Sequence, residues 1–309
     1  MSNRNVTVVS GASTGIGEAI ALRQARAGDH VWALVRNPES CANLRDAAER
    51  EHLLLELCEA DVTDSESVRA AIQRVVLESG RIDRFVCNAG IFIGATFESL
   101  SIVDHAEVFD VNYFGALRVI LEILPTMRMQ RSGTIVAVSS QSSEVVLPTW
   151  AAYSASKRAL ETALEALALE VGLLGIRIAL VQPGSTRTEM RKKISERTNH
   201  SDYSIPLSRY RDIVMADRET SIEADQVAGS VENLLHVDNP PWRTRVGSDA
   251  IRNTTKRQAA GDDRWVGFFQ ISEEASFRDA WGAPRSENKR IPARPDGVTV
   301  TSQEGEVRR

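Results

Sequence analysis

Two kinds of hydrophobic pattern alternate along most of the chain. Short runs of consecutive apolar residues are typical of strands buried on both faces, and longer segments with apolar residues every three or four positions are typical of helices. The first pattern predicts strands at residues 5–10, 30–35, 53–58, 84–87, 134–139 and 176–181, and allows a last strand at 243–246. The second pattern predicts helices at about 15–27, 41–51, 64–79, 103–131, 153–174 and 223–237.

Buried strands separated by helices predict a parallel sheet that is covered by helices on both faces. Right-handed crossovers then give an α/β fold with a doubly wound, Rossmann-like sheet in three layers, α/β/α. Proline lacks a backbone N–H, so Pro125 is expected to kink or break the helix predicted at 103–131. Asn112 and Gly115 are poor helix formers in the same segment, and together they suggest a kink or close packing.

The chain shows no internal repeat and no clear domain boundary, so we expect one domain over residues 1–284. Polar, weakly periodic residues at about 191–215 predict an insertion or mobile segment in this domain. We expect this segment to cover the substrate pocket, and its mixture of apolar and charged residues suggests a medium or bulky, partly apolar ligand. Residues 285–309 are rich in charge, proline and glycine and predict a polar, flexible tail.

Composition narrows the classes of function. The 309 residues are 42% hydrophobic and 26% charged, which is ordinary for a soluble globular protein. A net charge of −5 removes the electrostatic case for binding nucleic acid or an anionic membrane. The three cysteines have neither zinc-site nor disulfide-framework spacing, so we expect no metal and a reducing compartment. The first apolar run is too short for a signal peptide, and the expected location is the cytoplasm.

A glycine-rich segment, Ser10–Gly17 (SGASTGIG), follows the first predicted strand and opens the first predicted helix. Glycines let the backbone approach a phosphate closely, and a helix N-terminus offers unpaired N–H groups and a positive dipole end. The spacing differs from the common dinucleotide fingerprint, and such a turn alone also fits an ordinary strand-to-helix connection. The candidate cofactor-binding residues here are Gly11, Ser13, Thr14, Gly15, Ile16 and Gly17.

Tyr153 and Lys157 lie four residues apart in a predicted helix, so they share one face of it. A phenol is a poor base at neutral pH. An ammonium about 4 Å away would favour the phenolate by up to ~4 kcal/mol at an effective dielectric constant of 20. Such a tyrosine can exchange a proton near neutral pH. The spacing is moderately specific evidence for such a site, because only a small fraction of chains of this composition would contain it by chance.

Other small or polar side chains follow the predicted strands, at the sheet edge where ligands bind in such folds. Ser139 and Ser140 end the strand at 134–139 and could hold a substrate oxygen. Small residues after the strand at 84–87 would let a cofactor lie close, and the segment after the strand at 176–181 offers backbone groups and hydroxyls. These candidates are Asn88, Ala89, Gly90, Pro183, Gly184, Thr186 and Thr188.

Occurring together and in this order, these motifs resemble the short-chain dehydrogenase/reductase family, in its non-extended, single-domain branch. The resemblance covers residues 5–190 and is weaker to about residue 247. Ser10 stands where threonine is usual, and Cys87 stands for the first asparagine of the family's N-N-A-G motif. The resemblance implies a catalytic tetrad of Asn112, Ser140, Tyr153 and Lys157, with Ser140 preferred to Ser139 by register.

The resemblance also implies a nicotinamide cofactor, and the end of the second strand bears on which one. A carboxylate there would bind the adenosine 2′-hydroxyl, but the family's acidic position holds Val35 and is followed by Arg36. Arginine can pair with a 2′-phosphate and stack on adenine. We therefore predict NADP(H) over NAD(H), with Asp61 and Val62 along the adenine. The alternative is that Arg36 is an ordinary surface residue at the end of the strand and contacts only solvent.

The implied function is an NADP(H)-dependent oxidoreductase that interconverts a secondary alcohol and a ketone. In this scheme Tyr153 transfers the proton, Ser140 holds the substrate oxygen, Lys157 binds the nicotinamide ribose and Asn112 positions a relay water. The alternatives are a nucleotide-binding regulator or scaffold on the same fold and an NAD(H)-dependent dehydrogenase. Apolar residues on several faces of the helix segment at 159–174 suggest a subunit interface, and we expect a homodimer or homotetramer.

Overall fold

The computed structural model describes residues 4–188, 190, 201–273, 276–277 and 279. The chain divides into two compact units, Met1–Gly267 and Phe268–Arg309. In the second unit, the rings of Phe269 and Phe277 lie 5.8 Å apart between centroids. The fold and the site described below belong to the first unit.

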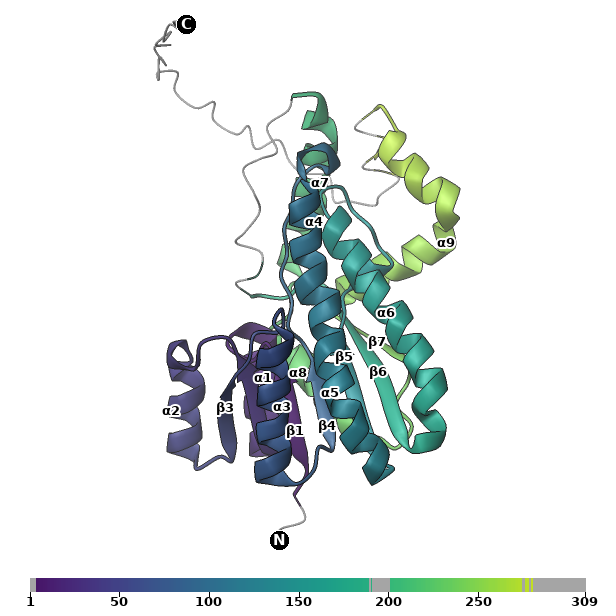
Figure 1. The fold of residues 1–309 in the computed structure, drawn as a ribbon. Coiled ribbons are helices and arrows are strands. Elements are labelled where there is room, and N and C mark those ends of the chain that lie inside the picture. Colours follow the sequence, from purple (N-terminus) through teal and green to yellow (C-terminus); the bar gives the residue numbers. More distant parts are fainter. Residues whose placement is uncertain (1–3, 189, 191–200, 274–275, 278, 280–309) are drawn as a thin grey trace, which may run out of the picture. The chain divides into compact units, whose positions relative to one another are not determined.

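Seven parallel strands form one sheet in the order β3-β2-β1-β4-β5-β6-β7 (Figure 1). Their bounds are β1 Val6–Ser10, β2 His30–Val35, β3 Leu55–Glu59, β4 Arg84–Cys87, β5 Gly133–Val138, β6 Ile176–Pro183 and β7 Arg243–Val246. The strand order runs one way from β1 to β3 and the other way from β4 to β7. The carboxyl ends of β1 and β4 therefore meet at a switch in direction, where ligands bind in open α/β sheets. The predicted doubly wound fold is confirmed.

Helices cover both faces of this sheet. Their bounds are α1 Gly15–Arg26, α2 Ala42–Glu51, α3 Ser65–Ser79, α4 Ile102–Phe109, α5 Gly115–Gln130, α6 Ala151–Val171, α7 Ser204–Glu219, α8 Ala224–His236 and α9 Ser248–Gln270. Helices α3, α5 and α6 contribute to the apolar layer on one face of the sheet, and α1, α2 and α8 to the layer on the other. The three predicted layers are therefore present.

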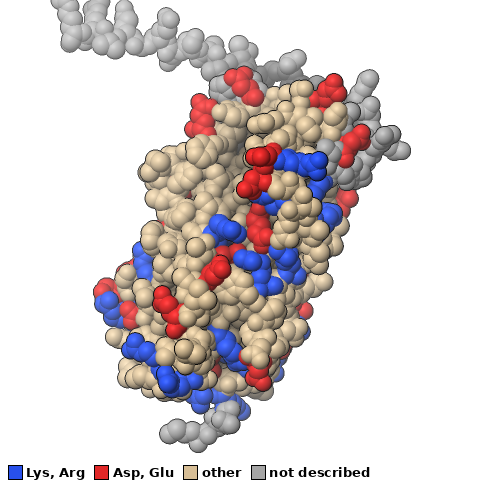
Figure 2. All heavy atoms as spheres, turned by 90° about the vertical axis from the view of Figure 1, so that its right-hand side faces the viewer, with Lys and Arg blue, Asp and Glu red and all other residues tan. Residues whose placement is uncertain are grey.

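Basic and acidic side chains are intermingled on the face of the molecule drawn in Figure 2. Exposed ion pairs form within and between helices, as between Arg26 Nε and Glu51 Oε2 at 2.7 Å and between Arg74 Nε and Glu78 Oε1 at 2.8 Å. Such pairs each contribute at most about 1 kcal/mol. The stability of the fold therefore depends on its interior.

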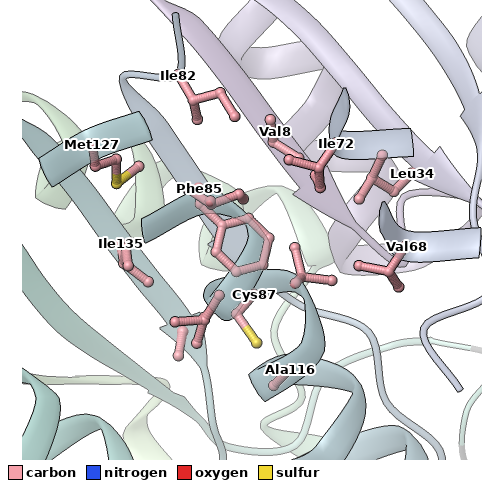
Figure 3. Close-up of a cluster of buried hydrophobic side chains, with 14 of the residues drawn as sticks. Val8, Leu34, Val68, Ile72, Ile82, Phe85, Cys87, Ala116, Met127 and Ile135 are labelled. Atoms are coloured by element: carbon pink, nitrogen blue, oxygen red, sulfur yellow. The ribbon is translucent and has the colours of Figure 1, made fainter. Parts of the chain in front are cut away.

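Neighbouring residues of each strand point into opposite layers of the core, as Val8 and Val9 of β1 do. Figure 3 shows part of the first layer: Val8, Leu34, Phe85 and Ile135 from the sheet, Val68 and Ile72 from α3, and Ala116 and Met127 from α5. Burying one such aliphatic or aromatic side chain contributes about 1.5–3 kcal/mol. The continuous apolar runs of the sequence are thus explained by strands that face a core on both sides.

The segment predicted as one helix over 103–131 differs from expectation. It is interrupted at Asp110–Phe114, which forms a π-helical turn, and α5 continues through Pro125 without a break. Pro125 leaves the carbonyl of Leu121 without its helical donor, but Leu121 lies on the exposed side of α5, where water can replace that donor. The close packing expected at Gly115 is present, since a Cβ there would lie 2.8 Å from Val62 Cγ2.

Two helices were not predicted. Helix α7 begins inside the segment expected at 191–215, whose residues 191–200 lie outside the described part of the chain, and α9 follows β7. Their buried faces are unusually polar: Arg209 and Asp217 are buried on α7, and Asp249 and Asn253 on α9. Because apolar periodicity marks a helix in sequence, a helix with a polar buried face is missed.

A buried ion pair lies at the amino-terminal edge of the sheet, away from the strand ends that form the site. Asp29, before β2, is 3% exposed, and its Oδ2 accepts hydrogen bonds from Thr7 Oγ1 at 2.6 Å and from Arg84 Nη1 at 2.7 Å. The pair joins β1, β2 and β4 at the start of each strand.

Replacing Asp29 with alanine should lower the free energy of unfolding by about 3–5 kcal/mol, because the guanidinium of Arg84 would stay buried without its carboxylate. Equilibrium urea unfolding measures this change. A loss below 1 kcal/mol would contradict the buried pairing.

Candidate functional site

A cavity of about 620 Å³ lies along the carboxyl ends of the central strands. Its walls combine the glycine-rich turn after β1, the segments after β2 to β6, the start of α6 and part of α7. The predicted site residues that line it are Gly11, Ser13, Thr14, Gly15, Ile16, Arg36, Asp61, Val62, Asn88, Ala89, Gly90, Ser140, Tyr153, Lys157, Pro183, Gly184, Thr186 and Thr188. Two predicted residues, Gly17 and Asn112, are not part of this lining.

The turns after β1 and β4 are pressed together at the base of the cavity. Gly11 has a φ of +64°, and a Cβ on it would lie 2.6 Å from Ala89 Cα. Asn88 holds the turn closed by donating from Nδ2 to the carbonyl of Gly11 at 2.9 Å. A Cβ on Gly17 would lie 2.1 Å from that same carbonyl oxygen, so Gly17 serves the packing of α1 behind the turn. The glycines therefore open a space that side chains would fill.

The amino-terminal end of α1 faces this space. Its N-cap residue, Thr14, makes no side-chain capping hydrogen bond, so the first-turn N–H groups have no cap from that hydroxyl. Thr188, after β6, lies opposite, since a Cβ on Gly15 would be 3.2 Å from Thr188 Cγ2. An uncapped helix N-terminus beside glycines fits the pyrophosphate of a dinucleotide.

Charged groups lie at the end of the cavity formed by β2 and β3. Arg36 is exposed directly after β2, and Asp61 follows β3. Thr63 donates to Asp61 Oδ1 from its hydroxyl at 2.7 Å and from its N–H at 2.9 Å. These hydrogen bonds, with a smaller effect of Arg36, hold the pKa of the Asp61 carboxyl below its usual range. Among the described residues, Arg36 makes no hydrogen bond or ion pair, so its guanidinium is available to a ligand.

Tyr153 and Lys157 lie on the first turns of α6 and both face the cavity. Lys157 is only 3% exposed, its Nζ donates to the carbonyl of Val138 at 3.0 Å, and it lies 5.9 Å from the centroid of the Tyr153 ring. Gly90 brings the segment after β4 against this ammonium, because a Cβ on it would lie 3.5 Å from Nζ. The phenol and the ammonium thus share one wall, as their four-residue spacing predicts.

The two serines after β5 have different surroundings. Ser139 Oγ donates to the buried carboxylate of Glu161 at 2.6 Å. Ser140 Oγ accepts the N–H of Ser142 at 3.1 Å, which leaves its own hydrogen for another acceptor. Of the two hydroxyls, that of Ser140 is therefore better suited to hold a substrate oxygen.

Asn112 is completely buried in the π-helical turn. Its Oδ1 accepts the N–H of Ile91 at 2.7 Å, and its Nδ2 donates to the carbonyl of Ile91 and to Ser156 Oγ, both at 3.0 Å. The π turn aims this amide at the segment after β4 and at α6. Asn112 therefore fixes two walls of the cavity from behind.

A buried polar network supports α6 behind Lys157, and the sequence reasoning missed it. Glu161, one turn after Lys157, accepts hydrogen bonds from Gln182 Nε2 and Arg243 Nη2, both at 2.9 Å. Burial disfavours the charged form of the neighbouring Glu144, but the hydrogen bond from Gln182 and nearby arginines outweigh it and hold the pKa of this carboxyl below its usual range. The sequence could have indicated Glu161, because it lies four residues after Lys157 and therefore on the same face of the helix.

Aromatic side chains line the end of the cavity beside Tyr153. The sequence reasoning missed Phe92, whereas Tyr210 belongs to the segment at 191–215 that was expected to cover the pocket. Trp150 packs edge to face against Phe92 at 5.2 Å, Tyr153 at 6.0 Å and Tyr210 at 6.3 Å between ring centroids. Tyr210 comes from α7, one of the helices that the sequence pattern did not reveal. This end of the cavity therefore suits an apolar group.

The described residues contain no group of three or more histidine, cysteine or acidic side chains arranged to hold a metal ion, and none of their helices is long and apolar enough to cross a membrane. The three cysteines are free and buried. Burial raises the pKa of the Cys87 thiol to about 11, so it stays protonated at neutral pH.

The chain is similar to known proteins in both sequence and fold. A family model described as short chain dehydrogenase matches residues 5–199. The chain is 32% identical over 246 residues to a 3-ketodihydrosphingosine reductase of Bacteroides thetaiotaomicron, covering 78% of this chain and 87% of that protein. It is 32% identical over 254 residues to retinol dehydrogenase 8 of Bos taurus, covering 78% and 81%.

Among solved structures, a short-chain dehydrogenase from Streptomyces avermitilis superposes with a TM-score of 0.76. It is 29% identical, and the match covers 88% of this chain and 98% of that one. The glycine turn, the tyrosine–lysine pair and the seven-stranded sheet thus occur together in a chain whose sequence and fold match one family. The protein belongs to the short-chain dehydrogenases, a family of oxidoreductases that bind NAD(P).

Proposed function

We propose that this protein is an NADP(H)-dependent oxidoreductase that interconverts a secondary alcohol and a ketone. The observation that carries the proposal is the shared wall on which Tyr153, Lys157 and Ser140 face one cavity. At the other end of that cavity lie an uncapped helix N-terminus and the exposed Arg36. The first group suits proton transfer to a carbonyl oxygen, and the second suits a phosphorylated cofactor.

The residues that would hold the cofactor follow the cavity from end to end. Arg36 and Asp61 would flank the adenosine, the turn Gly11–Gly17 the pyrophosphate, and Gly184 and Thr188 the nicotinamide end. When bound, the nicotinamide supplies or accepts the hydride. The close glycine packing described above leaves the space that such a dinucleotide requires.

The chain's own side chains would then handle the substrate oxygen. Ser140 would donate a hydrogen bond to it and orient the carbonyl group. Tyr153 would donate its phenolic proton as the oxygen becomes an alkoxide, and the reverse transfer would serve alcohol oxidation. The buried ammonium of Lys157 stabilises the phenolate left after this transfer, because water screens the pair poorly at this depth.

Replacing Tyr153 with phenylalanine should lower kcat by about 10²- to 10⁴-fold, because the proton donor is removed and the ring is kept. The measurement is NADPH oxidation with a panel of ketones, together with NADPH affinity by fluorescence, which should change by less than about threefold. Tyr210→Phe is the matched control, since Tyr210 also lines the cavity but is assigned no proton.

Turnover by Tyr153→Phe close to that of the unmodified protein would refute the role of the phenol. NADPH binding with no oxidation by any ketone, in the unmodified protein, would instead favour a nucleotide-binding regulator.

The choice of NADP(H) rests on Arg36. It is exposed directly after β2, lines the cavity and makes no hydrogen bond or ion pair within the described part of the chain. The preceding Val35 is buried and offers no carboxylate to the 2′-hydroxyl of NAD(H). A guanidinium in this position can bind a 2′-phosphate with two parallel hydrogen bonds.

Arg36→Asp should lower kcat/KM for NADPH by about tenfold or more and shift the preference towards NADH, because a carboxylate repels the 2′-phosphate. Steady-state kinetics with both cofactors measure the ratio. Arg45→Asp, on the exposed side of α2 and outside the cavity lining, controls for the change in net charge. An unchanged ratio in Arg36→Asp would remove the argument for NADP(H).

The aromatic end of the cavity favours an apolar substrate. Phe92, Trp150 and Tyr210 surround the position next to Tyr153, and Val214 adds an aliphatic surface from α7. The names of two relatives, a 3-ketodihydrosphingosine reductase and a retinol dehydrogenase, also refer to largely apolar molecules. We therefore favour ketones or alcohols with a bulky apolar group.

The protein is also proposed to be a homodimer or homotetramer. A shallow groove of about 220 Å³ lies between α5 and α6, and it is lined by leucines that include Leu121, Leu124 and Leu167. Leu121 is 67% exposed there. A second copy of this face would cover these side chains, as is common for the apolar faces of symmetric oligomers.

Leu121→Glu should shift the protein to a smaller species in light scattering coupled to gel filtration, because a charge would have to be buried in the interface. Leu77→Glu, on an exposed face of α3, is the control. An unmodified protein that is already monomeric, or an oligomer that Leu121→Glu leaves intact, would exclude this face as the interface.

A further inference from the structure

Asp249 is a completely buried carboxylate that the proposed reaction does not use. It lies in the first turn of α9, two residues after Gly247, whose φ of +104° turns the chain from β7 into the helix. A negative charge is stabilised at a helix N-terminus. Its Oδ1 nevertheless has no hydrogen-bond partner among the described residues. A buried polar atom without a hydrogen-bond partner is costly, so the position of this side chain calls for a specific explanation.

The other carboxylate oxygen joins the two segments that form the reactive end of the cavity. Oδ2 accepts the N–H of Ser185 at 2.6 Å and a hydrogen bond from Gln141 Nε2 at 3.1 Å. Ser185 directly follows Gly184, and Gln141 directly follows Ser140. One oxygen atom therefore connects the segment after β6 with the segment after β5.

The unsatisfied oxygen is packed against Gly184. A Cβ on this glycine would lie 2.1 Å from Asp249 Oδ1, so the carboxylate occupies the space where any other residue would place its side chain. Gly184 lines the cavity. Oδ1 therefore packs against the backbone of Gly184, and Oδ2 binds the N–H of Ser185, the residue that follows it.

Asn253 extends the connection to α7. One turn after Asp249, its Nδ2 lies 3.2 Å from Gln141 Oε1 and 3.3 Å from Asp217 Oδ2. Asp217 is buried on α7, the helix that supplies Tyr210 to the aromatic end of the cavity. The polar buried face of α9 therefore contacts the serine segment and the wall of the substrate end.

We propose that Asp249 is a positioning residue that fixes the segment carrying Ser140 relative to the segment carrying Gly184. This inference rests on the proposed function, in which Ser140 holds the substrate oxygen and Gly184 flanks the nicotinamide end. Hydride transfer requires these two groups at a fixed separation, and a misplacement of about 1 Å can lower a rate by about 10²-fold. Asp249 touches neither substrate nor cofactor in this scheme.

The test compares Asp249→Ala with Asp249→Asn in NADPH-dependent reduction of a ketone that the unmodified protein accepts. Asp249→Ala should lower kcat by about 10- to 100-fold. NADPH affinity should change by less than about threefold, because the glycine turn and Arg36 are untouched. Asp249→Asn keeps an acceptor oxygen for both donors and should recover kcat to within about fivefold of the unmodified protein.

Two further variants separate positioning from loss of stability. Gln141→Leu removes the hydrogen bond between Gln141 and Asp249 and should also lower kcat. Its combination with Asp249→Ala should lower kcat by less than the product of the two single effects, because both variants remove this same hydrogen bond. Gln141→Leu also serves as the test if Asp249→Ala does not fold. Asp29→Ala removes a carboxylate that is also buried but lies at the opposite edge of the sheet, and it should lower stability while kcat of the folded enzyme is kept.

The outcomes are distinguishable. If the unmodified protein reduces ketones and kcat of folded Asp249→Ala or of Gln141→Leu stays within about twofold, the positioning role is wrong and the proposed function stands. A fall in kcat of Asp29→Ala as large as that of Asp249→Ala would also contradict it, because general destabilisation would then explain both. If the unmodified protein turns over no ketone, the proposed function fails, and the inference fails with it.

Discussion

The arrangement of the site depends on one buried cation. Lys157 is almost inaccessible to water, and its ammonium donates to the carbonyl of Val138, the last residue of β5. Moving an ammonium out of water costs several kcal/mol unless its donors are satisfied. The end of β5, the position of α6 and the turn at Gly90 are therefore constrained together, because all three surround this ammonium. Because Tyr153 lies one turn before Lys157 on α6, the same constraint places its ring beside the ammonium.

The end of the cavity proposed to hold the cofactor is built on a different principle, which is the absence of side chains. Gly11 and Ala89 bring the turns after β1 and β4 into backbone contact, and Asn88 locks them together with its amide. Because the strand order reverses between β1 and β4, the helices that follow diverge above this contact. Backbone N–H groups are left facing a space of nucleotide size, and the sheet topology holds them there.

Most of the sheet and its helices could be predicted, because strands buried on both faces and amphipathic helices have distinct hydrophobic periods. The tyrosine–lysine pair was predictable for the same reason, since a spacing of four residues fixes a common helix face. Asn112 and Gly17 were identified by motif, but only coordinates show that both act behind the cavity wall. Asp249 could not be found, because its link to Gln141 spans more than a hundred residues of sequence and has no local pattern.

The polar buried faces of α7 and α9 bear on how this enzyme could be re-engineered. An apolar contact tolerates sliding and substitution, but Asp217 on α7 is matched to Arg252 and Asn253 on α9 by directional hydrogen bonds. A chimera that imported another protein's α7 alone would leave the buried amide of Asn253 without this carboxylate partner. Exchange of substrate preference by segment grafting would therefore require α7 and the first two turns of α9 to be transplanted as one module.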